Sequence, residues 1–154
     1  MGRNVFDAAR PTEKAVVDSH RGCVLPMRVL VVDDDDIARE LLASTLKQAG
    51  HTVFELSSAL GAPRAVFEHA IEAVVIDVTL PDLNGDKLTR VLRQNSRGRS
   101  LAIVLTSSRP VNELYALATA VDADAVVPKS EVRRRLDLAV AHAVRSRGRP
   151  SAPP

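Results

Sequence analysis

The stretch that decides the fold is residues 28–42, RVLVVDDDDIARELL, in which a short apolar run leads directly into four consecutive aspartates. Residues 29–32 are apolar without alternation, which is typical of a strand buried on both faces of a sheet. From Ile37 onward the apolar side chains recur at helical spacing, with Leu41 on the same face. Adjacent carboxylates repel one another, so their concentration at the end of a buried strand must be explained by other parts of the chain.

The same alternation of strand-like and helix-like stretches continues along the chain and predicts five βα units around a parallel sheet. The predicted strands are residues 28–32, 51–55, 73–77, 101–106 and 125–128. The first helix is expected to stop at Gly50, because glycine is a usual residue at helix ends. The other predicted helices are residues 59–70, 86–95, 110–120 and 131–146, the last with Ser130 placed to cap its start.

Length and composition favour one globular domain. The chain has 154 residues and 45% hydrophobic content, and its net charge of +2 is too small to imply nucleic acid or a membrane as partner. A single cysteine, Cys23, excludes an intramolecular disulfide and fits a reducing compartment. The apolar runs are far shorter than the roughly 20 residues of a membrane span. We therefore expect a cytoplasmic protein without a membrane segment.

The chain is expected to divide into three parts. Residues 1–26 have no sustained period and are predicted to be a loosely ordered extension, with Met27 as a candidate translation start. Residues 27–147 form the predicted domain, and residues 148–154, rich in Pro and Ser, are predicted to be disordered. Because this tail is too short for an effector domain, the sequence favours a stand-alone domain.

Polar side chains gather where the predicted strands end. In an open α/β sheet, ligands bind outside the carboxyl ends of the strands, and those ends carry Asp33, Asp34, Asp77, Thr106 and Lys129. Clustered carboxylates without imidazole or thiol suit a hard cation such as Mg²⁺, which would neutralise their repulsion. A carboxylate beside a metal, an ammonium group and a hydroxyl can attack phosphorus, so the set predicts formation of an aspartyl phosphate.

Four motifs in order resemble the receiver domain of bacterial two-component response regulators. They are VLVVDDDD, VVIDVTLPDLNG, IVLTSS and DAVVPKS, and the resemblance spans about residues 27–147. It implies a flavodoxin-like fold, with a five-stranded parallel sheet of order 2-1-3-4-5 and helices on both faces. It also implies a phosphoprotein in phosphorelay signal transduction, similar to the stand-alone chemotaxis regulators.

The resemblance assigns a role to each matching residue. Asp77 matches the phosphoacceptor, Asp34 a direct Mg²⁺ ligand, Asp33 a ligand acting partly through water, and the backbone carbonyl of Thr79 a third ligand. The remaining matches, Thr106 and Lys129, would contact the phosphoryl group. The donor would be a phosphohistidine on a sensor histidine kinase or a phosphotransfer protein. The chain would catalyse its own phosphorylation without multiple turnover, and its output would be binding of a downstream protein or a phosphorylation-dependent homodimer.

Other positions are interpreted structurally. Asp35 and Asp36 are expected to begin the first helix, where carboxylates interact favourably with the helix dipole. Tyr115 is expected to be a packing residue. Two positions depart from the family pattern: Lys129 follows a proline instead of preceding one, and Val126 stands where an aromatic residue is usual.

Three alternatives remain at this stage. Residues 147–150, Arg-Gly-Arg-Pro, resemble the core of an AT-hook that binds the DNA minor groove, although nucleic acid is not the expected partner. Asp33 and Asp35 also satisfy the Asp-x-Asp pattern of haloacid-dehalogenase-like phosphatases. The third alternative is a receiver that works as a docking module without phosphorylation.

Overall fold

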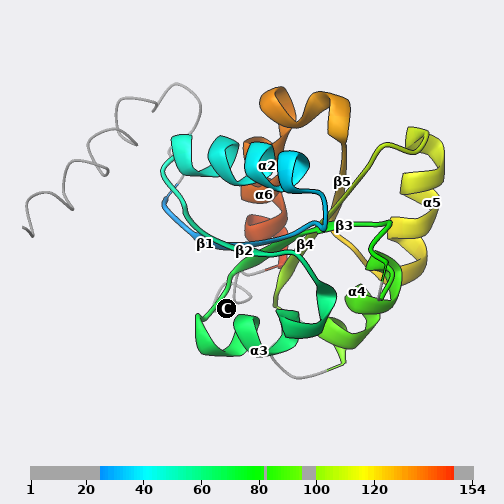
Figure 1. The fold of residues 1–154 in the computed structure, drawn as a ribbon, viewed down its shortest axis with the longest axis horizontal. Coiled ribbons are helices and arrows are strands. Elements are labelled where there is room, and N and C mark those ends of the chain that lie inside the picture. Colours follow the sequence, from blue (N-terminus) through cyan, green and yellow to red (C-terminus); the bar gives the residue numbers. More distant parts are fainter. Residues whose placement is uncertain (1–24, 82, 95–99, 148–154) are drawn as a thin grey trace, which may run out of the picture.

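A computed structural model describes residues 25–81, 83–94 and 100–147 of the chain. It contains a five-stranded parallel sheet in the order β2-β1-β3-β4-β5, as predicted (Figure 1). The strands are β1 (Arg28–Val32), β2 (Thr52–Leu56), β3 (Ala73–Asp77), β4 (Ala102–Ser107) and β5 (Ala125–Pro128). The predicted extension and the predicted tail lie outside the described residues, apart from residues 25 and 26.

Two strands begin one residue later than predicted. The β1–β2 ladder starts with Arg28 opposite Thr52. His51 lies just before the ladder, because its buried side chain binds the Met27 backbone: His51 Nδ1 accepts a hydrogen bond from the Met27 N–H at 3.1 Å. The β3–β4 ladder likewise starts with Ala73 opposite Ala102. The predicted bounds 51–55 and 101–106 are therefore each shifted by one residue.

The helices follow the predicted pattern, with two changes at their starts. They are α2 (Asp36–Gln48), α3 (Ala62–Glu68), α4 (Gly85–Arg93), α5 (Val111–Val121) and α6 (Val132–Arg147). Short 3₁₀ turns, η2 (Ala59–Gly61) and η4 (Lys129–Glu131), precede α3 and α6 where continuous helices were predicted. Ser130 therefore lies inside a 3₁₀ turn instead of capping α6. At the end of α2, Gly50 has φ 101°, the left-handed conformation that glycine adopts readily.

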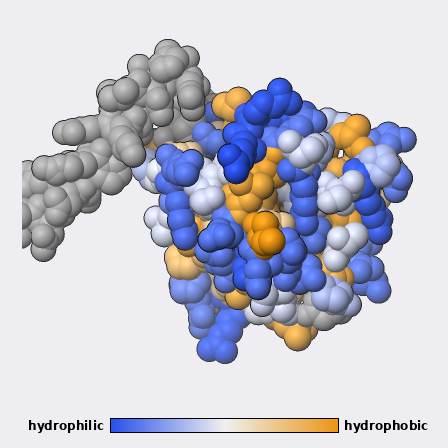
Figure 2. Space-filling model, turned by 45° about the horizontal axis from the view of Figure 1, so that its top comes forward, coloured by the Kyte–Doolittle hydropathy of each residue, from blue (hydrophilic) through white to orange (hydrophobic). Residues whose placement is uncertain are grey.

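Two apolar cores cover the two faces of the sheet. Helices α2 and α6 pack on one face, and α3, α4 and α5 pack on the other (Figure 1). The strands β1, β3 and β4 are buried on both faces, which explains their continuous apolar runs. On the surface view, hydrophobic residues form small patches among hydrophilic ones (Figure 2). Because the strands are parallel, all of their carboxyl ends meet at one edge of the sheet.

Candidate functional site

Three aspartates meet at the carboxyl-end edge of the sheet. The β1–β3 ladder ends with Val32 opposite Ile76, so Asp33 and Asp77, the next residue on each strand, are neighbours. One carboxylate oxygen from each of Asp33, Asp34 and Asp77 lies within 4.8 Å of the others. Asp33 and Asp77 are buried and Asp34 is exposed. The sequence therefore located this cluster correctly.

Asp33 is held by a backbone N–H and by a lysine. Its Oδ1 accepts a hydrogen bond from the Asp35 N–H at 2.9 Å. Oδ2 forms an ion pair with Lys129 Nζ at 2.9 Å. Burial raises the pKa of Asp33, and the charge of Asp77 adds to this, although the Asp35 N–H and Lys129 act in the opposite direction. The site thus holds a buried carboxylate oxygen that faces a cation.

Lys129 reaches both buried carboxylates. Its Nζ lies 2.9 Å from Asp33 Oδ2 and 3.5 Å from Asp77 Oδ2. Burial by itself would lower the pKa of Lys129, but the hydrogen bond to Asp33 and the negative charges of Asp77 and Asp33 outweigh it and raise the pKa. The order Pro128-Lys129 therefore still places the ammonium group in the cluster.

Thr79 contacts Asp77 in a way that the sequence analysis missed. The N–H and the hydroxyl of Thr79 both lie 3.2 Å from Asp77 Oδ1 and donate to it. A carboxylate that accepts from the N–H two residues on is an Asx turn, so the Asp-x-Thr spacing was the available signal. Asp77 therefore presents one oxygen held by Thr79 and one that faces Lys129.

Thr106 lies beside Asp77 on the neighbouring strand. The two residues are paired in the β3–β4 register. Thr106 is fully buried, and its hydroxyl lies 3.5 Å from the Ile76 carbonyl oxygen, to which it donates. The structure therefore brings Thr106 next to Asp77, with the hydroxyl held by the backbone of β3 and not by the carboxylate.

Gly85 packs directly under Asp77. A Cβ atom at this position would lie 2.6 Å from the Asp77 carbonyl oxygen and 2.8 Å from Val78 Cα, closer than non-bonded atoms approach. The Gly85 N–H also donates to the Val78 carbonyl at 3.0 Å. The sequence indicated only a turn here, because the close approach depends on how α4 packs against the end of β3.

The second half of the acidic run begins a helix, as predicted. Asp35 is the N-cap residue of α2, and its side chain accepts from the Ala38 N–H at 2.8 Å. Asp36, in the first turn, pairs with Arg39 at 2.6 Å. Asp35 is thus used for capping, which speaks against the Asp-x-Asp phosphatase alternative.

A surface hollow lies over β5 between α5 and α6. Its volume is about 420 Å³, and its lining includes Tyr115, Val126, Arg135, Leu138, Ala139 and His142. Val126 is buried, whereas Tyr115 and Leu138 are 52% and 56% exposed. Tyr115, which was predicted to be a packing residue, is therefore half exposed on the wall of the hollow. We call this feature the α5–α6 hollow.

The opposite edge of the sheet holds an ion-pair cluster. The two oxygens of Asp124 accept from Arg93 and Arg147 at 2.9 Å each, and Arg147 also pairs with Asp122 at 2.9 Å. Arg147, the first residue of the AT-hook-like stretch, is thus engaged by two carboxylates. The remainder of that stretch lies outside the described residues.

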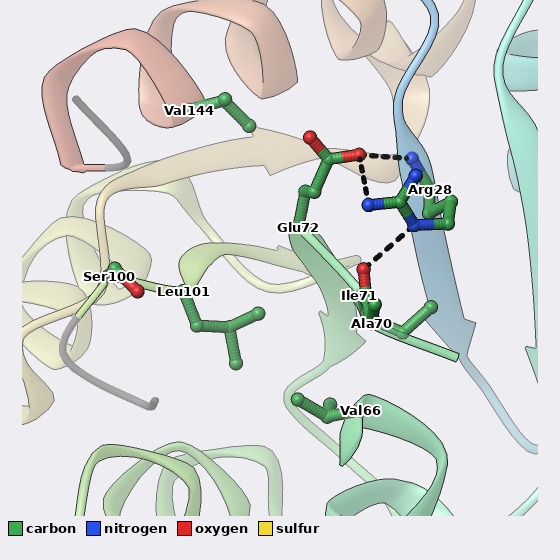
Figure 3. A pocket seen from close by; sticks show the side chains of 8 residues that line it. All are labelled: Arg28, Val66, Ala70, Ile71, Glu72, Ser100, Leu101 and Val144. Carbon is green, nitrogen blue, oxygen red and sulfur yellow. Dashed lines mark hydrogen bonds and ion pairs between the residues drawn. The ribbon is translucent and has the colours of Figure 1, made fainter. Parts of the chain in front are cut away.

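A cavity of about 280 Å³ lies at this same edge (Figure 3). Arg28 and Glu72, which line it, bind each other: the Arg28 N–H donates to Glu72 Oε2 at 2.9 Å, and the guanidinium lies 3.5 Å from the same oxygen. Arg28 Nε donates to the Ala70 carbonyl at 2.9 Å. The two charged groups of this cavity are therefore paired with each other.

Residues 29–141 match the family model of the response regulator receiver domain. The chain belongs to this family. It is a receiver domain of two-component signalling, and receiver domains are phosphoryl acceptors. Among the described residues of this receiver domain, no helix has both the length and the apolar character needed to cross a membrane.

Curated relatives agree with this assignment. Response regulator MprA of Mycobacterium sp. (strain KMS) is 39% identical over 106 residues, which cover 68% of this chain and 45% of that protein. Sensory/regulatory protein RpfC of Xanthomonas campestris pv. campestris is 33% identical over 128 residues, covering 79% of this chain and 18% of that protein. The receiver domain thus spans less than half the length of either relative.

Solved structures share the fold. A two-component response regulator of the LuxR family from Aurantimonas sp. SI85-9A1 has a TM-score of 0.72 at 27% identity, covering 80% of this chain and 88% of that one. A sensor protein from Polaromonas sp. JS666 has a TM-score of 0.71 at 30% identity, covering 79% and 97%. The family result, with the order of the five strands, removes the phosphatase alternative.

Proposed function

We propose that Asp77 accepts a phosphoryl group from a phosphohistidine on a sensor histidine kinase or a histidine phosphotransfer protein. An Asp77 carboxylate oxygen attacks phosphorus, an O–P bond forms, the N–P bond breaks, and the histidine side chain leaves. The position of Asp77 supports this role most directly, because its Oδ2 is at the carboxyl-end edge, 3.5 Å from Lys129 Nζ. The domain would accept one group at a time, without multiple turnover.

Lys129 and Thr106 would receive the transferred group. The Lys129 ammonium already faces Asp77 Oδ2, so it can balance the charge of phosphoryl oxygens bound there. The Thr106 hydroxyl would turn from the Ile76 carbonyl toward the phosphoryl group. This change would couple the modification of Asp77 to β4 and to the start of α5.

The acidic cluster fits Mg²⁺. Three carboxylates lie together, and no described residue forms a hydrogen bond or ion pair with the Asp34 side chain. Hard oxygen donors of this kind suit Mg²⁺, which keeps several waters. Asp33, Asp34, Asp77 and the backbone carbonyl of Thr79 would hold the ion. When bound, it would neutralise charge on the carboxylates and the phosphoryl oxygens.

Output would proceed through protein binding at the α5–α6 hollow. The hollow exposes Tyr115 and Leu138. Val126 in its floor pairs with Leu105 and directly precedes Val127, the residue that pairs with Thr106. Phosphorylation would shift the population of conformations at this face, to bind a downstream protein or a second copy of the chain. We place the protein in the cytoplasm, where sensor kinases present their phosphohistidines.

Acetyl phosphate tests the proposed reaction. The protein is incubated with acetyl phosphate and Mg²⁺, or with beryllofluoride and Mg²⁺, beside Asp77→Asn. We expect intact mass to rise by one phosphoryl group in the wild type and not in Asp77→Asn, and size-exclusion chromatography to report any change of oligomeric state. Absence of uptake by the wild type would favour the docking module that works without phosphorylation.

The aspartyl phosphate is expected to decay slowly. In receiver domains the positions of Thr79 and Ser108 flank the path of an attacking water, and neither residue carries a carboxylate or an amide that would orient it. The measurement is the decay of phosphorylated protein in wild type and in Thr79→Asn. Faster decay in the variant is expected, and an equal or slower decay would contradict this account of Thr79.

A further inference from the structure

Arg39, near the start of α2, ties the loop after β1 to two other elements. Its side chain is only 18% exposed. Nη1 donates to the Asp33 carbonyl oxygen at 2.9 Å, and Nη2 donates to Asp36 Oδ1 at 2.6 Å. Nε lies 3.6 Å from Oε1 of Glu55 on the edge strand β2. The other oxygen of Glu55 pairs with Lys47 at 3.4 Å, so the acceptor on β2 is itself held in place.

These contacts fix the peptide groups on both sides of Asp33. The Asp33 N–H donates to the Leu56 carbonyl at 3.1 Å, and its carbonyl accepts from Arg39. Its Oδ1 accepts from the Asp35 N–H. Oδ2 is therefore the one hydrogen-bonding atom of Asp33 that no backbone group or guanidinium holds, and it faces Lys129. The same peptide carries Asp34, so Arg39 also limits where the Asp34 carboxylate points.

Two effects of Arg39 on a bound cation have opposite signs. As a positive charge it repels a metal ion at Asp33, so its removal would strengthen binding. As an anchor it holds the loop in the binding conformation, so its removal would weaken binding. Asp36 and Glu55 already compensate the guanidinium charge, which reduces the repulsion. The geometry therefore favours the anchoring effect.

We propose that Arg39 is a positioning residue for the divalent-cation site. It acts through the Asp33 carbonyl, and it links the affinity of that site to Glu55 on the edge strand. This inference rests on the proposed function, since it concerns Mg²⁺ at Asp33, Asp34 and Asp77. Partners of metal ligands typically change affinity by about 10 to 100-fold when they are removed.

Calorimetric titration with Mg²⁺ tests the proposal on the full, unphosphorylated chain. The variants are Arg39→Gln, which removes the charge, and Arg39→Lys, which keeps the charge but not the planar group that reaches several acceptors. We expect both to bind Mg²⁺ about 10-fold more weakly than the wild type. Melting temperatures in EDTA establish that each variant is folded before it is titrated.

Two further variants sharpen the test. Glu55→Gln removes the ion pairs on β2 but leaves Arg39 in contact with Asp33, so a smaller loss of affinity is expected. Arg64→Gln removes an arginine of the same type from an exposed i,i+4 pair with Glu68 on α3, so its Mg²⁺ affinity should equal that of the wild type. With acetyl phosphate, Arg39→Gln should need more Mg²⁺ for half-maximal uptake but reach a near-normal rate at saturation.

The outcomes separate the inference from the function on which it rests. If the wild type binds Mg²⁺ and folded Arg39→Gln binds it equally or more tightly, Arg39 acts only as a charge and the proposal is overturned. Wild-type affinity in Arg39→Lys would overturn it as well. If both Arg39 variants fail to fold, unchanged affinity in Glu55→Gln overturns it. A wild type that binds no Mg²⁺ refutes the proposed metal site itself.

Discussion

The two edges of the sheet hold their carboxylates in opposite ways. At the carboxyl-end edge, Asp33 and Asp77 share one lysine, whose Nζ lies 2.9 Å from Asp33 Oδ2 and 3.5 Å from Asp77 Oδ2. At the opposite edge, Asp124 accepts from Arg93, from Arg147 and from the Ile103 N–H at 2.8 Å. At the edge where a ligand can bind, three carboxylates thus have one lysine between them. At the other edge two carboxylates are paired with two arginines, and these ion pairs contribute stability.

Removing an arginine from the ion-pair cluster at the opposite edge should give the largest loss of stability. Arg93→Ala leaves the Asp124 side chain, which is only 9% exposed, with one of its two arginine partners. Arg93 also donates to the backbone of Leu101 and Asp122. Removing one partner of a buried ion pair typically costs about 3–5 kcal/mol, so we expect a loss of about 3 kcal/mol in the free energy of unfolding by urea. Phosphoryl uptake per folded molecule should not change.

Arg64→Ala is the matched control for Arg93→Ala. Its side chain is 82% exposed and pairs only with Glu68 on the same helix, so no measurable change in unfolding is expected. Equal losses in the two variants would show that the ion-pair cluster contributes no more than a surface pair.

Gly85→Ala should disturb the carboxyl-end edge of the sheet through steric overlap, without changing any charge. The added methyl group would meet backbone atoms at 2.6 Å and 2.8 Å, so the end of β3 or the start of α4 must shift. Forcing extra atoms into a packed region costs about 1–3 kcal/mol, and we expect a loss of about 2 kcal/mol together with slower phosphoryl uptake. Denaturation and uptake from acetyl phosphate measure the two effects.

Gly61→Ala serves as the comparison for Gly85→Ala. The nearest atoms to an added Cβ there are side-chain carbons of Leu56 at 3.6 Å, an ordinary contact. Its stability and phosphoryl uptake should stay close to the wild type. Normal uptake in folded Gly85→Ala would show that the Asp77 backbone need not be held so closely.

Asp33→Asn should stabilise the protein in EDTA. The amide oxygen can still accept from the Asp35 N–H, and the buried charge whose pKa is raised is gone. A raised pKa means that the ionised carboxylate costs stability in the folded state, so we expect the free energy of unfolding to increase at neutral pH. Mg²⁺ should no longer raise the melting temperature.

The difference in stability between the wild type and Asp33→Asn should depend on pH. Native Asp33 keeps its proton to a higher pH than the ordinary value of 3.8, at which the unfolded chain loses it. Wild-type stability therefore falls as pH rises from that value through the raised pKa, and Asp33→Asn lacks this fall. The advantage of the variant should grow across the same window in urea titrations. A constant difference at all pH values would contradict the raised pKa.

Much of the fold could be predicted because it depends on local patterns. Continuous apolar runs mark β1, β3 and β4, and a parallel sheet brings their ends together, so Asp33 and Asp77 could be paired from sequence. The one-residue shift of β2 could not be predicted, since it depends on a long-range hydrogen bond from Met27 to the His51 side chain.

The supporting residues of the site were missed for a similar reason. Arg39 lies on a predicted helix, but no periodicity indicates that its side chain reaches back to the Asp33 carbonyl and across to Glu55. The contact of Gly85 with Asp77 depends on the packing of α4. Sequence patterns thus locate the groups that react, whereas the tertiary structure identifies the groups that hold them.

The exposed Tyr115 gives this receiver domain a built-in optical probe. The chain contains no tryptophan and a single tyrosine, so tyrosine emission from the whole molecule originates at one site on the wall of the α5–α6 hollow. Because Val126 stands on β5 where an aromatic residue is usual in the family, no tryptophan or second tyrosine emits from that hollow. Fluorescence of the unlabelled, unmutated protein can therefore follow events at this face in real time.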